Sequence, residues 1–253
     1  MDRRTSIFLL LTSSVCACSA LCLVGSLGVP YVKRVNVIAY RGALMSAMAG
    51  FLYRIGYSAK LEGYSFGALQ KCFVPIAVSN GFQYTMYCLI FLTGRPVPTV
   101  LFPLVVHSAY QVMTIVNKHF GESAAYKRIG GGKLFSYAQE NMHRAVMMCA
   151  TMEVSVLLLV LMELFTPARS VSRVVMYVNV LRAKYACTDN TVFRIKFTYY
   201  DTGFYHRQVW NMIDEKTTAP LLSRVGFLKT PVKLVQKWFT GVDMDRGKEN
   251  KQQ

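Results

Sequence analysis

The chain has 253 residues, of which 53% are hydrophobic, and 29 basic residues against 13 acidic ones give it a formal net charge of +16. Long stretches carry almost no charge, and the remaining stretches are dense in lysine and arginine. This separation argues against an ordinary soluble domain and indicates a membrane protein whose loops meet an anionic surface.

The first apolar segment runs from Ser6 to Leu27 and follows Arg3 and Arg4. A signal peptide would look similar, with small residues at 18–20 as its cleavage site, but the apolar run continues to Val29 and is too long for the usual signal core. At about 1.5 Å per residue, it is long enough to cross the hydrocarbon. We therefore predict a retained membrane-spanning helix.

The second segment, Val37 to Tyr57, is apolar and rich in small residues, which permit close packing of helices inside membranes. Arg41 and Arg54 each lie about one turn from an end, so each could extend its charge to the nearer interface. The segment either spans the membrane, which we favour, or lies in the interface as an amphipathic helix.

Two uncharged runs, Phe73 to Thr93 and Pro98 to Val116, flank a break at residues 94–98 that contains one glycine and two prolines. Proline removes a backbone donor and clashes with the preceding turn of a helix, so the helix must be interrupted there. Because an interrupted backbone is costly in hydrocarbon, the break belongs at a membrane surface. The sequence predicts a helical hairpin with Arg95 at its tip.

Asn117 to Arg144 is polar and basic, and its three consecutive glycines lack the spacing of a phosphate-binding loop, so we expect a flexible linker. Ala145 to Phe165 is the clearest span. Val171 to Tyr185 is shorter and either spans or lies in the interface. Pairing the six segments as three hairpins with both termini cytosolic puts most basic residues on the cytosolic side, as the positive-inside rule requires.

Two carboxylates, Glu153 and Glu163, interrupt the span at 145–165. Intramembrane carboxylates mark ion routes or structural partners of arginine. Glu163 is expected at the depth of Arg41, Arg169 and Arg173, any of which could be its counter-ion. No basic residue obviously reaches Glu153, which is expected to be protonated and hydrogen-bonded or to face a wet crevice. We favour structural roles, because nothing resembles the inverted repeats of transporters.

No catalytic or metal-binding pattern can be assembled from the sequence. Glu140 and His143 have the spacing of a di-iron motif, but a second such motif is absent, and His107, His119 and His206 stand alone. The seven cysteines form no CxxC pair, so they are interpreted as small apolar residues. We predict a protein that is not an enzyme and has no cofactor or metal.

The C-terminal region, from Thr191, interleaves aromatic and basic residues. It contains an apolar stripe with lysines beside it, and we predict that ten residues bind membrane: Leu221, Val225, Leu228, Lys229, Val232, Lys233, Val235, Lys237, Trp238 and Phe239. Nucleic acid is a second interpretation of such a pattern, disfavoured after a membrane domain, and internal packing of the stripe is a third. The predicted organisation is a transmembrane domain over 1–190, amphipathic cytosolic helices over 191–240 and a disordered tail over 241–253.

The order of these segments resembles the transmembrane protein 33 family, the Krüppel-homologue group of endoplasmic-reticulum and nuclear-envelope membrane proteins. The similar stretches are YCLIFLTGRPVPTVLFPLVVHSAY, AYRGALMSAMAGFLYRI, CATMEVSVLLL and MYVNVLRAKY, within about residues 6–240. The resemblance implies a non-enzymatic role in organising tubular endoplasmic reticulum, with reticulon-type proteins and nuclear pore components as partners.

We therefore expect an all-α, multi-pass protein of the endoplasmic reticulum membrane and nuclear envelope that shapes or scaffolds the membrane. Its partners would be the lipid bilayer, anionic lipids and other membrane proteins, with an oligomer possible and no nucleic acid. In this interpretation Glu163 pairs with Arg41 or Arg173 for structural reasons. Two alternatives stay open: a structural subunit whose tail binds a protein, and a transporter or channel subunit in which Glu153 is accessible to water.

Overall fold

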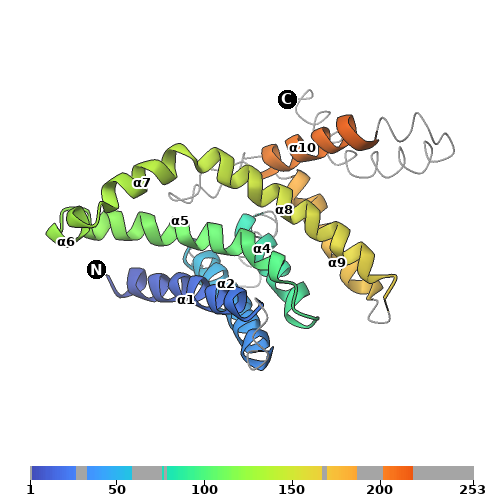
Figure 1. Ribbon diagram of the computed structural model, residues 1–253, viewed down its shortest axis with the longest axis horizontal. Helices are drawn as coiled ribbons and strands as arrows, with labels where there is room; N and C mark the ends of the chain where they lie inside the picture. Colours follow the sequence, from blue (N-terminus) through green and yellow to red (C-terminus); the bar gives the residue numbers. More distant parts are fainter. Residues whose placement is uncertain are drawn as a thin grey trace, which may run out of the picture.

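The computed structural model describes residues 2–26, 33–58, 76, 79–166, 170–186 and 202–218 (Figure 1). Within these ranges the chain is helical and contains no strand. Four of the described helices are long and apolar enough to cross a membrane, judged by length and composition: Arg3–Gly25, Val35–Gly56, Pro98–Phe120 and Met142–Glu163. This confirms the predicted fold class, an all-α multi-pass membrane protein.

The first two helices, α1 (Arg3–Ser26) and α2 (Lys33–Ser58), form an antiparallel pair. Near one end, the Cys22 thiol lies 2.7 Å from Asn36 Oδ1, and further along a Cβ on Gly50 would meet Leu11 Cβ at 3.9 Å. The small residues that the sequence places in α2 thus let the two backbones approach closely, as expected for helices packed inside a membrane.

The predicted hairpin break is present between α4 (Asn80–Leu92) and the 3-10 turn Pro98–Val100, which continues into α5 (Leu101–Phe120). Ser79 caps α4, accepting a hydrogen bond from the Phe82 backbone N–H at 3.3 Å. The Tyr87 hydroxyl of α4 donates to the Val100 carbonyl at 3.0 Å, and this bond links α4 to the turn that begins the second arm. α4 is shorter than the predicted run from Phe73, most of whose first residues lie outside the described ranges.

A third hairpin joins α8 (Met142–Glu163) to α9 (Val171–Ala186), and α10 (Thr202–Ile213) packs on both of them. α10 lies beside α8 at the upper edge of Figure 1, while α5 runs between this group and the α1–α2 pair. A five-residue π-helical turn, Asp214–Thr218, extends α10.

The prediction of a flexible linker over 117–144 was wrong. α5 continues to Phe120, and two further helices follow, α6 (Ala124–Arg128) and α7 (Gly131–Glu140), before α8 begins. Gly130 has φ 72°, in the left-handed region that glycine adopts readily, and turns the chain from α6 into α7. Gly131 is buried against Tyr126, so the glycines permit a tight corner between two helices.

This corner gives a matched test. A Cβ at Gly131 would overlap the Tyr126 ring, whereas a Cβ at Gly132 would meet nothing within 4 Å. Overpacking costs about 1–3 kcal/mol, while alanine in place of an exposed helical glycine stabilises by roughly 0.5–1 kcal/mol. We expect Gly131→Ala to lower the midpoint of thermal unfolding in detergent and Gly132→Ala to leave it unchanged or raise it. Equal midpoints for the two variants would contradict the described packing.

Candidate functional site

A buried charge cluster joins three helices at Glu153, near the middle of α8. Glu153 Oε2 lies 2.7 Å from Lys184 Nζ of α9 and 2.9 Å from His206 Nε2 of α10. The side chains of all three residues are at most 2% exposed. We call Glu153, Lys184 and His206 the buried charge cluster. One carboxylate balances one lysine in it when His206 is neutral.

The expectation that no basic residue reaches Glu153 was therefore wrong, as was the interpretation of His206 as an isolated histidine. The cause is the antiparallel register of α8 and α9. The two ion pairs between these helices are Glu163–Arg173 and Glu153–Lys184. They are separated by 163 − 153 = 10 residues on α8 and 184 − 173 = 11 residues on α9, almost the same length of helix. The antiparallel pairing of α8 and α9 thus places Lys184 at the same depth as Glu153.

Aromatic side chains surround the lysine of this cluster. Lys184 Nζ lies 3.6 Å from the centroid of the Tyr84 ring and 5.6 Å from that of Tyr87, both on α4. Such contacts stabilise a desolvated cation by about 2 kcal/mol. The Tyr177 hydroxyl also donates to the Glu153 carbonyl at 2.7 Å. Four helices, α4, α8, α9 and α10, therefore contribute to one buried polar network.

A second ion pair lies at the C-terminal end of α8, where Arg173 Nη1 approaches Glu163 Oε2 to 2.7 Å. The Arg173 guanidinium also occupies the space beside Gly94, where a Cβ would overlap it, so this pair reaches the hairpin break between α4 and α5. Of the three expected counter-ions, the structure pairs Arg173 with Glu163. Arg41 is exposed on α2, and Arg169 lies outside the described residues.

Arg173 and Arg41 provide a matched pair of charge deletions. The Arg173 and Glu163 side chains are 12% and 22% exposed. Their pair lies between an exposed pair, worth at most about 1 kcal/mol, and a fully buried one, whose disruption costs about 3–5 kcal/mol. We expect Arg173→Ala to lower the free energy of unfolding in mixed micelles by about 1–3 kcal/mol and Arg41→Ala by less than about 0.5 kcal/mol. Equal losses would mean that the pair has no structural role.

α10 is attached to the membrane domain by more than the buried charge cluster. Tyr205 and Val209 pack against Ala150 and Val154 of α8. The Tyr205 hydroxyl lies 2.8 Å from His143 Nδ1, near the start of α8. α10, which belongs to the predicted C-terminal region, is thus packed on protein along the first half of α8.

The predicted membrane-binding residues are not placed. The structure gives no account of these ten side chains, which all lie beyond residue 218, outside the described ranges: Leu221, Val225, Leu228, Lys229, Val232, Lys233, Val235, Lys237, Trp238 and Phe239. Among the residues that are described, no group of three or more histidine, cysteine or acidic side chains could hold a metal ion.

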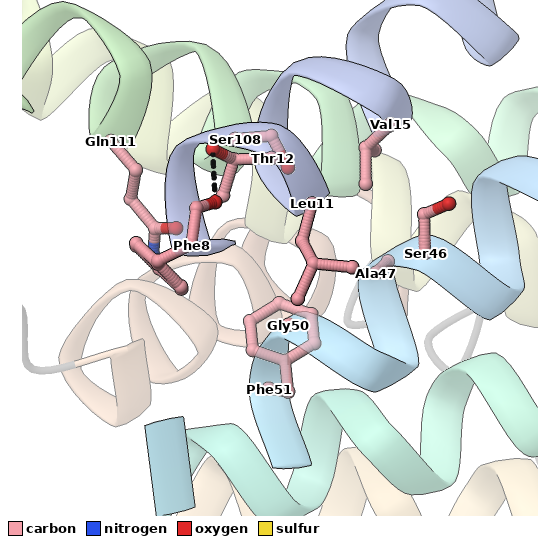
Figure 2. A pocket seen from close by; sticks show the side chains of 10 residues that line it. All are labelled: Phe8, Leu11, Thr12, Val15, Ser46, Ala47, Gly50, Phe51, Ser108 and Gln111. Atoms are coloured by element: carbon pink, nitrogen blue, oxygen red, sulfur yellow. Dashed lines mark hydrogen bonds between the residues drawn. The ribbon is translucent and has the colours of Figure 1, made fainter. Parts of the chain in front are cut away.

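A small pocket lies where α1, α2 and α5 meet, and Figure 2 shows its lining side chains converging. Its volume is about 10 Å³, space for one water molecule at most. The Thr12 hydroxyl beside it donates to the Phe8 carbonyl of its own helix at 2.9 Å, and Ser108 and Gln111 add polar atoms. Metabolite sites occupy roughly 300–1,000 Å³, so this pocket is a packing gap between helices.

Comparison with known proteins gives one family. The model of the family described as Transmembrane protein 33/Nucleoporin POM33 matches residues 10–233, which include every described helix from α2 to α10 and most of α1. No curated protein and no solved structure matches the chain.

Proposed function

Because the chain belongs to the Transmembrane protein 33/Nucleoporin POM33 family, we propose that it is a non-enzymatic membrane-shaping or scaffold protein of the endoplasmic reticulum and nuclear envelope. The nucleoporin in the family name makes nuclear pore components its proposed partners, together with reticulon-type membrane proteins. Both termini would be cytosolic, which leaves most of the basic residues facing an anionic leaflet.

The observation that carries this proposal is the attachment of α10 to the membrane domain. His206 reaches Glu153 inside the helix bundle, and Tyr205 reaches His143 near the start of α8. α10, which precedes the tail in the chain, is therefore held beside a membrane-spanning helix. An amphipathic segment starting there would insert into one leaflet only, and its added area would favour curvature toward that side.

The hairpins supply the second part of the proposed mechanism. α4 has only 13 residues and is therefore shorter than the roughly 20 residues of a full span, whereas α5 and α8 have 20 and 22 residues. Helices of unequal length occupy the two leaflets unequally. Wedge-shaped hairpins and a one-sided amphipathic tail would then act in the same direction.

A second candidate is a structural subunit whose tail binds a protein partner. One observation favours it: the apolar residues of α10, Tyr205 and Val209, are buried against α8, so this part of the C-terminal region packs on protein. The transporter alternative predicts a water-accessible Glu153, and the side chain of that residue is 1% exposed and ion-paired.

Reconstitution of the full chain into anionic liposomes tests the proposed function. Vesicle diameters would be measured by electron cryo-microscopy at increasing ratios of protein to lipid. A membrane-shaping protein should shift the population to smaller vesicles or tubules in proportion to its density. Diameters that match protein-free liposomes at every ratio would reject membrane shaping and favour the partner-binding subunit.

A further inference from the structure

The corner made by α6 and α7 has an apolar face that the described part of the protein covers only in part. Along α7, apolar and small residues occupy one half of the helix, and polar residues occupy the other. The first half consists of Gly131, Leu134, Phe135, Tyr137 and Ala138, and the second of Gly132, Lys133, Ser136, Gln139 and Glu140.

One side of this apolar half packs against other residues that the structure describes. Gly131 is buried against Tyr126, and the Ala138 carbonyl accepts a hydrogen bond from the Tyr110 hydroxyl of α5 at 2.8 Å. In contrast, Leu134 is 60% exposed and Tyr137 is 64% exposed. These two residues lie one turn apart, so they form an outward-facing apolar strip.

The turn and helix ends around this strip are basic. Arg128 and Lys133 are exposed, and Ile129 between them is 80% exposed. From residue 117 to 137 the chain has four basic residues, at 118, 127, 128 and 133, and one acidic residue, at 122, which gives 4 − 1 = +3 with His119 neutral. An exposed apolar strip next to such a charge matches an anionic lipid surface.

The position of the corner agrees with this partner. It connects the ends of two candidate spans, Pro98–Phe120 and Met142–Glu163. The hydrogen bond from Tyr110 holds α7 alongside the second half of α5, and Figure 1 shows α6 and α7 beside that end of α5. α7 is therefore next to a membrane-spanning helix and within reach of lipid.

We propose that the α6–α7 corner is a lipid-binding surface, with Leu134, Tyr137 and Ile129 among the acyl chains and Arg128 and Lys133 at anionic phosphate groups. The sidedness of this surface, the cytosolic leaflet, rests on the topology in the proposed function. This proposal concerns residues 128–137 and the membrane-shaping proposal concerns the tail beyond residue 218, so either proposal can be wrong without the other.

Photo-crosslinking of the full chain in nanodiscs tests the proposal. Benzoylphenylalanine would replace Leu134 in one variant and Ser136 in another, because Ser136 is exposed on the polar half of the same helix. Nanodiscs would contain phosphatidylserine and phosphatidylcholine, each carrying a distinct clickable tag. We expect lipid adducts at position 134 to exceed those at 136 several-fold, and to persist with Val225→Asp, a substitution in the tail.

A further variant tests whether the surface requires its basic side chains. Each basic side chain near an anionic leaflet favours binding roughly fivefold, so Arg128→Gln with Lys133→Gln should reduce the ratio of serine-lipid to choline-lipid adducts by at least about fivefold. Equal lipid adducts at positions 134 and 136 would overturn the proposal, as would an unchanged lipid ratio. Adducts at 134 between two copies of the chain would overturn it in favour of a protein interface.

Discussion

Replacing Glu153 with alanine is expected to destabilise the protein by about 3–5 kcal/mol, because the substitution leaves the buried Lys184 without its carboxylate. The Lys184 side chain is 1% exposed, and the same substitution also removes the carboxylate that contacts His206. The loss would be measured as the free energy of unfolding in mixed micelles, by titration with a denaturing detergent.

The matched control is a double substitution that removes both charges. Glu153→Gln with Lys184→Met keeps the volume of the side chains and leaves no ion pair at these two positions. Replacing a buried ion pair by uncharged groups of similar size often changes the free energy of unfolding very little. We therefore expect the double variant to be more stable than either single variant, with a coupling energy of about 0.5–3 kcal/mol or more between the two sites. Strictly additive losses would mean that the ion pair contributes nothing.

The expected consequence extends to the C-terminal region. His206 links α10 to Glu153, and Tyr205 and Val209 pack on α8. Loss of the carboxylate should loosen α10 before it unfolds α8, because among the described helices α10 packs mainly on α8 and α9, whereas α8 also packs on α5 and α7. Faster hydrogen exchange over 202–213 than over 142–163 would be the signature in the Glu153→Ala variant.

Val225→Asp is the substitution expected to have the largest effect on membrane shaping. Val225 belongs to the predicted apolar stripe of the tail, and a carboxylate there would face the acyl chains of the leaflet. We expect this variant to fold normally yet to leave liposome diameters close to those of protein-free vesicles. The measurement is the electron cryo-microscopy of reconstituted vesicles described above.

Ser223→Asp controls for the added charge. Ser223 is two residues away, about 200° around a helix, so the same carboxylate would face the water. Its vesicles should resemble those of the unchanged chain, apart from a small loss of attraction to the anionic leaflet. If Val225→Asp and Ser223→Asp reduce membrane shaping equally, the effect depends on net charge alone, and the prediction of an amphipathic stripe is wrong.

Hydropathy and proline placement predicted most of the fold. The break at residues 94–98 has a local cause, since one glycine and two prolines within five residues interrupt a helix, and α4 ends before this break and α5 begins after it. The two helices of the 117–144 region were missed because its polar and basic residues suggested a flexible linker exposed to solvent. α7 nevertheless has its apolar residues at helical spacing, and this signal could have identified it.

The buried charge cluster is a different case. Lys184 lies 31 residues from Glu153 along the chain, and His206 lies 53 residues away. No local pattern can bring them together, because their contact depends on the register between α8 and α9 and on the docking of α10. The sequence did offer an energetic argument, because a carboxylate in the middle of a span requires a partner. Lys184 is a basic residue on α9, the helix that folds back along α8.

A preference of this chain for curved membrane is tested most directly by measuring how the protein distributes between flat and curved bilayer. The fluorescently labelled full chain would be reconstituted into giant anionic vesicles, and a narrow tube would be pulled from each. We expect the ratio of protein to lipid fluorescence to be higher in the tube than in the vesicle and to rise as the tube narrows. An equal ratio at every tube radius would contradict it.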